Sequence, residues 1–346
     1  MSAVGSTAAG EGPAGVDGLD AIMTRGGERL RRLMARTERH LERVTAEAGA
    51  PLASHANATI AAGGKRLRPL LVVLAAESAG GPPDSPDGED RLVRAAVAVE
   101  LVHSATLVHD DLIDGAQLRR GRPTVAAVAG RAVAVATGDL LFSRAFAELA
   151  RNDDATQLWA LSEASSALAA GELLQREDAY ASHVAVERYL RRCELKTAAL
   201  FEAACRLGAL TAAEGSAQLA DGLGAFARRI GLAFQMLDDV LDVSGPVERT
   251  GKSRGTDLLD GTVTLPFILA REREPELATW DLASLGGPVQ AEALCERIAA
   301  TGALDEARER ALAVVAEAKA ALPAILPDGA STQLELVADA VVERYR

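Results

Sequence analysis

Two aspartate clusters of the same form, Asp-Asp-x-x-Asp, occupy residues 110–114 and 238–242 of this 346-residue chain, each after a long apolar run. In a helix, residues i, i+1 and i+4 project along one side, so each cluster directs its carboxylates toward one region. Like charges at this spacing repel, and desolvation by apolar neighbours increases the cost, so the clusters require a cation. Carboxylate oxygens favour Mg²⁺, which binds one or two carboxylates together with substrate phosphates. The six candidate metal ligands are Asp110, Asp111, Asp114, Asp238, Asp239 and Asp242.

Either cluster taken alone has a simpler explanation as a solvated acidic stretch. The apolar runs that precede them, Leu101 to Val108 and Ile230 to Leu237, argue against it, because a solvated face needs no such flanks. Facing helices of a bundle can hold a metal in its core through carboxylates. The pair of clusters therefore predicts a divalent-metal site between two helices.

The rest of the chain has helical rather than strand periodicity. Apolar residues between Leu30 and Val44 recur at 3.6-residue spacing with Arg and Glu between them. Aromatic residues make up 3% of the chain, and Ala, Leu and Val dominate the 49% hydrophobic content, which favours closely packed helices over a β-sandwich or barrel. Further helices are predicted near 67–79, 90–113, 131–150, 156–178, 185–209, 214–243, 261–272, 288–300, 303–322 and 331–344. We therefore predict an all-α fold.

No change in composition marks a domain boundary. Residues 1–19 are rich in Gly, Ala and Ser and predict a disordered tail, and we expect residues 20–346 to form a single all-α domain. The net charge of −12 argues against a general nucleic-acid surface. Three cysteines without metal-ligand spacing indicate a reducing compartment. Charges interrupt every apolar run before the roughly 18 residues of a membrane span, so we expect a cytoplasmic protein with no membrane span.

Basic residues lie where they can complement the carboxylates. Residues 63–69 place three cations behind a glycine pair, and Arg119-Arg120 follows five residues after Asp114. Guanidinium groups suit bidentate phosphate recognition, although the first group can also be an exposed helix start. Lys196-Thr197 lies in an apolar helix as either a surface lysine or a buried phosphate contact, and Lys252 follows the second cluster. Cations opposite metal-binding carboxylates predict a site for two diphosphates, and hence two substrates.

Together these motifs resemble the trans-isoprenyl diphosphate synthase family, also called polyprenyl synthetases, and in particular its longer-chain members. The resemblance covers, in order, residues 64–69, His103 with the first cluster, residues 119–121, Lys196-Thr197, Phe234-Gln235 with the second cluster, and Lys252 with Thr256-Asp257. It implies a single large bundle of mostly antiparallel helices around a central cavity, usually as a homodimer. It also implies a prenyltransferase that adds isopentenyl diphosphate to an allylic diphosphate, with three Mg²⁺ ions when substrate is bound.

The resemblance implies roles for individual residues. The first cluster and Arg119 hold the allylic diphosphate, directly or through Mg²⁺, and the second cluster completes the metal site. Isopentenyl diphosphate is held by the residues Gly64, Lys65, Arg68, His103 and Arg120. The leaving group and the carbocation are stabilised by Lys196, Thr197, Gln235 and Lys252. The departing diphosphate takes the proton, so a Ser–His dyad is not needed and His109 is expected to be structural.

Two positions depart from the family pattern. Thr262 stands where many members carry a lysine after the glycine, so one diphosphate contact is missing or supplied elsewhere. Glu172 stands where short-chain members often have Gln, which makes the segment more similar to longer-chain synthases.

The residues before the first cluster indicate a long product. Val102, Ala105 and Thr106 are expected on the helix face toward the cavity, and none of them is bulky. Short-chain relatives commonly carry Phe or Tyr at the position matching Ala105, so we expect a product of C30 or longer. The alternatives are a short-chain farnesyl or geranylgeranyl diphosphate synthase and a partner subunit of a heteromeric synthase. A terpene cyclase is disfavoured, because cyclases lack the basic segment for a second diphosphate.

Overall fold

The computed structural model describes residues 16–47, 49–181, 183–245, 254–324, 326, 329–343 and 345, and within this part nearly all regular structure is helical. The prediction of an all-α fold is confirmed. The longer helices are α1 (Val16–Arg25), α2 (Gly27–Ala46), α3 (Leu52–Ala61), α4 (Leu67–Ser78), α5 (Pro86–Ile113), α7 (Arg131–Ala150), α8 (Ala155–Asp178), α9 (Val186–Cys193), α10 (Ala199–Thr211), α11 (Ala217–Ser244), α14 (Leu265–Arg273), α16 (Pro288–Ala300), α17 (Ala303–Ala321) and α18 (Thr332–Glu343). Shorter elements are α6 (Val125–Ala129), η1 (Glu194–Ala198), α13 (Thr256–Leu259), α15 (Pro275–Ala278), η2 (Leu282–Ser284), η3 (Leu322–Ala324) and the antiparallel pair β1 (Leu118–Arg119) and β2 (Arg122–Pro123).

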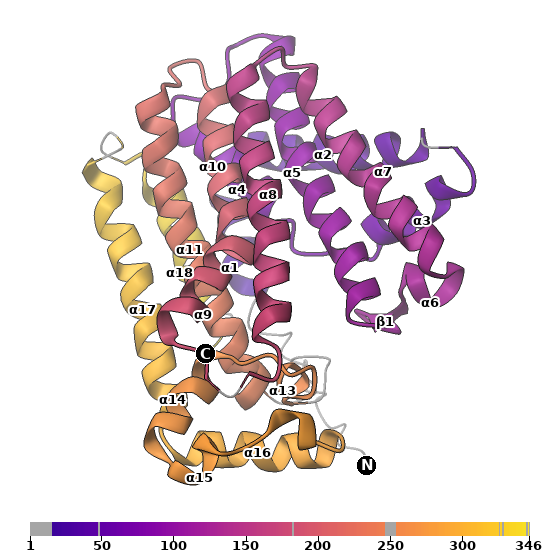
Figure 1. Cartoon of the computed structure of the whole chain (residues 1–346). Coiled ribbons are helices and arrows are strands. Elements are labelled where there is room, and N and C mark those ends of the chain that lie inside the picture. The colour runs from indigo at the N-terminus through magenta and orange to yellow at the C-terminus, as the bar shows by residue number, and fades with distance from the viewer. Residues whose placement is uncertain are drawn as a thin grey trace, which may run out of the picture.

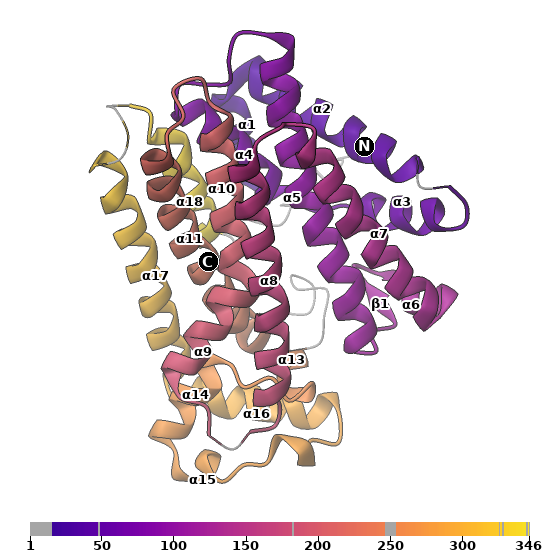
Figure 2. The same ribbon diagram turned by 45° about the horizontal axis from the view of Figure 1, so that its top comes forward.

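Long helices pack side by side around α4 and α10 (Figures 1 and 2). Helix α10 contacts α4, α8 and α11, while α17 and α18 cover one flank of the bundle and α3, α6 and α7 lie on the other. Every residue of α4 from Pro69 to Ala76 is buried. A helix that is apolar on all sides belongs inside the fold, which explains the central position of α4.

The two helices that carry the aspartate clusters are built alike. Helices α5 and α11 are both 28 residues long, and each begins with a serine that caps the first turn: Ser85 Oγ accepts from Gly88 N–H at 3.0 Å and Ser216 Oγ from Leu219 N–H at 3.2 Å. Each cluster falls at the C-terminal end of its helix. Because the helix dipole is negative at that end, it adds to the charge of the carboxylates and strengthens the need for a cation.

The structure extends the predicted helices at the N-terminus. Helix α1 begins at Val16, so residues 16–19, which the sequence analysis assigned to a disordered tail, are helical. The reason is tertiary: Ile22 is fully buried, and Gly18 lies so close to α18 that an added Cβ would come within 2.8 Å of Ala340 Cβ. The Gly, Ala and Ser content of the segment indicates a weak local preference for helix. It does not indicate that the segment packs against α18. Helices α3, α6, α13 and α15 and the β1–β2 pair were also not predicted.

One predicted helix contains an irregular turn. Residues 185–209 were expected to form a single helix, but η1, between α9 and α10, has π-helical hydrogen bonding. A π turn inserts one residue into a helix and often marks a functional site. This turn contains Lys196 and Thr197.

Within the described residues, helix α5 is long and apolar enough to cross a membrane by length and composition alone. Its most apolar 18-residue window is 78% buried inside the bundle. A core helix can have the same length and composition because it is apolar on most sides. The burial assigns α5 to the centre of the fold.

Candidate active site

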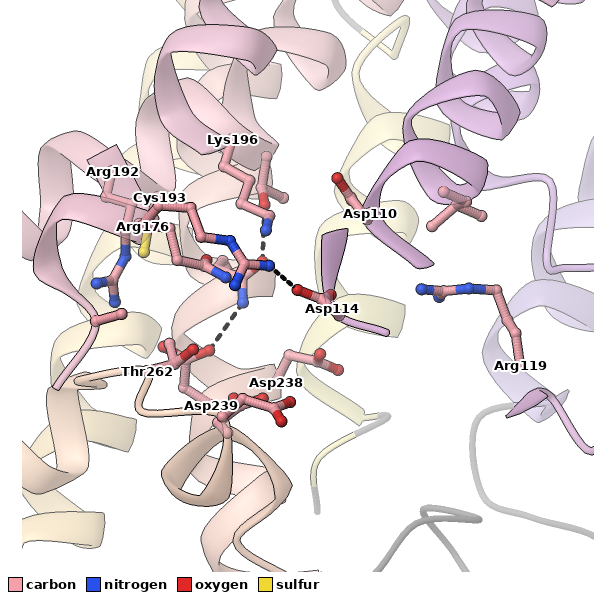
Figure 3. A pocket seen from close by; sticks show the side chains of 17 residues that line it. Asp110, Asp114, Arg119, Arg176, Arg192, Cys193, Lys196, Asp238, Asp239 and Thr262 are labelled. Carbon is pink, nitrogen blue, oxygen red and sulfur yellow. Dashed lines mark hydrogen bonds and ion pairs between the residues drawn. The ribbon is translucent and has the colours of Figure 1, made fainter. Parts of the chain in front are cut away.

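One cavity receives residues from both aspartate clusters (Figure 3). Asp110 and Asp114 line it from the end of α5, and Asp238 and Asp239 line it from α11. Four cationic side chains also line the cavity, namely Arg119, Arg176, Arg192 and Lys196. The fold therefore brings together two carboxylate pairs that are far apart in the sequence, together with cations from α8, α9, η1 and β1.

The remaining two predicted ligands, Asp111 and Asp242, do not line the cavity. Asp111 is buried, and its Oδ1 accepts a hydrogen bond from Arg119 Nε at 2.7 Å. Asp242 Oδ2 accepts from the backbone N–H of Asp257 at 3.2 Å, at the start of α13. In this arrangement both carboxylates hold neighbouring segments in place.

The donor chemistry of the cavity suits a hard divalent cation. Among the described residues, no three His, Cys, Asp or Glu side chains come close enough together to hold an ion by themselves. Mg²⁺ characteristically takes only one or two carboxylates and completes its coordination with water and substrate phosphates. The carboxylate pairs on two walls of this cavity fit that mode of binding and would hold Mg²⁺ together with a phosphate ligand.

The first cluster is embedded in ion pairs with α8 and η1. Arg176 pairs with Asp114 and, through Nε at 3.2 Å, with Glu172 Oε1, and Glu172 also pairs with Lys196. Burial raises the pKa of Asp110 to about 6, although the charge of Lys196 opposes the shift. A cation in the cavity would offset the cost of ionising this carboxyl.

The second cluster is part of a hydrogen-bonded chain. Thr197 Oγ1 donates to Gln235 Oε1 at 2.7 Å, and Gln235 Nε2 donates to Asp239 Oδ1 at 2.8 Å. Tyr189 donates its phenolic hydrogen to the other oxygen of Asp239, at 2.7 Å. Burial raises the pKa of Asp239 to about 7, with the charge of Asp257 as a further cause. The chain links two of the predicted catalytic residues, Thr197 and Gln235, to a cluster carboxylate.

Two glycines make room for the π turn that carries Lys196 and Thr197. An added Cβ on Gly171 of α8 would lie 2.5 Å from the backbone nitrogen of Lys196. One on Gly231 of α11 would lie 2.8 Å from Ala198 Cα. Both contacts are with backbone atoms that cannot rotate away, so the two glycines set the position of η1 between α8 and α11.

We expect Gly171→Ala to displace η1 and lower turnover at least about tenfold, because a misplacement of about 1 Å in a catalytic group has large kinetic effects. Steady-state kinetics and circular dichroism of the purified variant measure turnover and folding separately. Gly286→Ala is the matched control, since its added Cβ would meet only the flexible side chain of Gln290, at 3.2 Å. Equal turnover in Gly171→Ala and the parent would show that η1 tolerates the shift.

The residues expected to hold the second diphosphate lie near one another. An added Cβ on Gly64 would be 2.9 Å from Arg120 Nη1. The guanidinium of Arg68 stacks on the ring of Phe201, 4.8 Å from its centroid, and its buried Nε has no hydrogen-bond partner among the described residues. Burial lowers the pKa of Arg68 to about 10, and the charge of Arg120 adds to this effect. Burial, followed by the charges of Arg68 and Arg120, lowers the pKa of His103 well below its usual value, so His103 is neutral at pH 7.

Lys65 lies beside this group and is exposed. Arg66, by contrast, is occupied within the fold, because it donates to Glu38 and Glu100 at 2.6 and 2.7 Å. Lys252, the remaining predicted catalytic residue, lies outside the described residues.

The residues predicted to govern chain length separate into two environments. Thr106 lines an apolar pocket beside Asp110, together with Ile113, Phe142, Leu168 and Leu173. Ala105 and Val102 are fully buried and do not line this pocket. His109 also lines the pocket, and its Nε2 lies 3.3 Å from the carbonyl oxygen of Val135.

Four residues at the site were missed by sequence reasoning. Tyr189 lies seven residues before Lys196, on the same side of the helix, which is the signal that was available. Arg176 follows Glu172 by one helical turn, a spacing typical of an ion pair. Arg192 precedes Lys196 by four residues, a spacing that places both cations on one side of a helix. Tyr345, whose hydroxyl donates to Asp238 Oδ1 at 3.2 Å, has no comparable signal, because only the return of the chain past α18 brings it there.

Comparisons with known proteins show the family to which the chain belongs. Residues 50–296 match the polyprenyl synthetase family. The chain is 41% identical over 241 residues to heptaprenyl diphosphate synthase component 2 of Geobacillus stearothermophilus, covering 70% of this chain and 73% of that one. It is 37% identical over 290 residues to geranylgeranyl diphosphate synthase of Methanosarcina mazei, covering 82% and 86%.

The fold gives the same result. The crystal structure of a decaprenyl diphosphate synthase from Rhodobacter capsulatus superimposes with a TM-score of 0.84 at 32% identity, covering 95% of this chain and 99% of that chain. Its all-α isoprenoid synthase architecture is therefore shared over almost the full length. With its motifs, its cavity and these relatives in agreement, the chain belongs to the polyprenyl synthetase family.

Proposed function

We propose that this prenyl diphosphate synthase joins isopentenyl diphosphate to an allylic diphosphate and releases diphosphate, to give an all-trans polyprenyl diphosphate of C30 or longer. The observation that carries the proposal is the placement of two carboxylate pairs on one cavity, with a separate basic group around Arg68. A carboxylate-lined cavity suits a metal-chelated diphosphate, and the basic group suits a second diphosphate. The enzyme class of the relatives supports the same reaction.

Asp110, Asp114, Asp238 and Asp239 would hold Mg²⁺, with three ions when the allylic substrate is bound. Bound Mg²⁺ would neutralise the charge that develops on the leaving diphosphate. Lys196 and Arg119 add fixed positive charge at the same place.

The remaining residues have roles in the chemistry between the two substrates. As the allylic carbon–oxygen bond breaks, the electron pair leaves with the diphosphate, and the side-chain oxygens of Thr197 and Gln235 face the resulting carbocation. Arg68, His103 and Arg120 hold isopentenyl diphosphate so that its double bond attacks that carbon. The departing diphosphate accepts the proton that is then lost.

The apolar pocket beside Asp110 supports a long product. Apart from His109, Asp110, Glu172 and Lys196, its lining consists of apolar or small side chains, including Thr106, Ser165 and Ala169. A prenyl chain that enters there from the first cluster meets surface from which apolar groups gain free energy on burial. The relatives include synthases named for heptaprenyl and decaprenyl products and one named for geranylgeranyl diphosphate, so this assignment rests on the pocket.

The decisive experiment is to incubate the purified protein with Mg²⁺, isopentenyl diphosphate and each allylic diphosphate from C5 to C20, and then to size the products. We expect chains of C30 or longer. Products that stop at C15 or C20 would identify a short-chain synthase. The heteromeric alternative rests on the relative whose name calls it a component. It requires that the protein makes no product alone and makes product only when a second subunit is added.

We also propose a homodimer in the cytoplasm. Helices α7 and α8 pack together and expose apolar side chains on the outside of the bundle, with Val135 of α7 38% exposed and Trp159 and Leu173 of α8 each 66% exposed. Exposed apolar groups of this size on adjacent helices are typical of an interface.

Trp159→Asp is expected to shift the protein from dimer to monomer, because it places a charge on the apolar face proposed as the interface. Light scattering coupled to size exclusion measures the mass directly. Val289→Asp, which changes an apolar side chain that is 83% exposed on α16, is the control and should leave the mass unchanged. A Trp159→Asp variant that keeps the mass of the parent would exclude this face as the interface.

A further inference from the structure

Arg192 is an unusually placed arginine. It belongs to α9, is only 3% exposed, and lines the cavity that receives both aspartate clusters. Its Nη2 donates to the carbonyl oxygen of Val263 at 2.6 Å, but its buried Nη1 has no hydrogen-bond partner among the described residues. Buried guanidinium groups are normally hydrogen-bonded at each nitrogen, so Nη1 has the capacity for a further hydrogen-bond acceptor.

Asp178 forms an ion pair with this nitrogen but no hydrogen bond. Asp178 Oδ2 lies 3.8 Å from Arg192 Nη1, which is beyond hydrogen-bonding distance, and it is also without a hydrogen-bond partner among the described residues. The other oxygen of Asp178 accepts from Arg188 Nε. Arg192 is therefore hydrogen-bonded at Nη2, while its Nη1 is ion-paired with Asp178 and has no hydrogen bond among the described residues.

The charge of Arg192 acts on the second aspartate cluster. It is one of the influences that lower the pKa of Asp239, opposing the larger effect of burial. Thr262 lines the same cavity and precedes Val263, the residue to which Arg192 is bonded. Figure 3 shows Arg192 and Thr262 on the same side of the cavity, with Asp239 nearby.

This wall of the cavity is otherwise acidic. Asp238, Asp239, Asp257 and Asp260 line it, while Thr262 contributes a neutral side chain. A diphosphate held against these carboxylates through metal also needs a direct cation for its remaining oxygens. Arg192 brings such a cation from a different helix to the neighbourhood of Thr262.

We propose that Arg192 binds the allylic diphosphate directly and supplies the positive charge that Thr262 does not. The proposal rests on the proposed function, since it takes that diphosphate as its ligand. The competing explanation is that Arg192 only anchors the segment at Val263. The two explanations predict different effects of a lysine at position 262 in a protein that lacks Arg192. Such a lysine can replace the lost positive charge, but it does not restore the hydrogen bond to the Val263 carbonyl oxygen.

A double-mutant cycle tests this difference with Arg192→Met, Thr262→Lys and the two combined. Calorimetry with inorganic pyrophosphate and Mg²⁺ measures binding without turnover, and the KM for the allylic substrate and the melting temperature are measured beside it. We expect Arg192→Met to weaken pyrophosphate binding about tenfold or more, Thr262→Lys to change it less than about threefold, and the combined variant to recover most of the loss. Arg188→Met is the control, because Arg188 also pairs with Asp178 but is 45% exposed and does not line the cavity.

Normal pyrophosphate binding by folded Arg192→Met would overturn the proposal, as would a combined variant no better than Arg192→Met. If Arg192→Met does not fold, Thr262→Lys alone decides: binding tightened tenfold would show that the wall lacked a cation, whereas unchanged binding supports the proposal. Failure of the proposed function is recognised separately, because it would abolish product formation by the parent while the pyrophosphate cycle still reports on Arg192.

Discussion

Asp110→Ala and Asp238→Ala are each expected to lower turnover by about 100-fold or more while the protein remains folded. The two residues line one cavity from different helices. Each substitution therefore removes a carboxylate that would hold Mg²⁺ during the step that separates charge. The stability of Asp110→Ala should be preserved. Burial raises the pKa of Asp110 to about 6, which means that its ionised form is unfavourable in the folded protein and its loss costs no stability.

The measurement is the turnover number at saturating substrate over a series of Mg²⁺ concentrations, with the melting temperature of each variant as the test of folding. Asp305→Ala, at a carboxylate that is 79% exposed on α17, provides the control and should keep the activity of the parent. Near-normal turnover in either cluster variant would remove that cluster from the metal site.

Thr106→Phe is expected to shorten the product from C30 or longer toward C15 or C20. Thr106 lines the apolar pocket beside Asp110, one helical turn before it, so an aromatic ring there narrows the space that a growing chain enters. Sizing the products of the parent and the variant on the same substrates measures the effect. Thr156→Phe, at an exposed position in the first turn of α8, is the control and should leave the product length unchanged.

The neighbouring position should respond differently. Ala105 is fully buried and does not line the pocket, so Ala105→Tyr is expected to overpack the core and lower stability by about 1–3 kcal/mol. An Ala105→Tyr variant that is as stable as the parent and makes shorter chains would show that the pocket extends to this position. Equal product lengths in Thr106→Phe and the parent would show that another surface sets chain length.

The long helices were the most predictable part of the fold. The segments 131–150 and 288–300 were predicted with the bounds that the structure has, and α5 and α11 were predicted to within a few residues. These segments carry continuous apolar periodicity over many turns, so local pattern and tertiary packing agree. Short elements such as α13 and the β1–β2 pair have too few residues for a period to be recognised.

The irregular elements depended on contacts between distant segments. Helix α1 is ordered by packing on α18, and the π turn at η1 depends on the close approach of Gly171 and Gly231. The sequence lists the residues that make such contacts, but it does not show which distant residues contact one another. For the same reason Val102 and Ala105 were expected to face the cavity, whereas the packing of α5 leaves Thr106 at the pocket and buries the other two.

The sequence by itself determined the all-α class, the family, and the candidate charges, because spacing within a helix decides which side chains share a face. Only the tertiary structure decided which of those charges meet. It placed Asp110, Asp114, Asp238 and Asp239 on one cavity, directed Asp111 to Arg119 and Asp242 to the start of α13, and brought Arg192 beside Thr262. The physical reason is that a helix period relates residues one or two turns apart, whereas a site between helices depends on how their ends pack together.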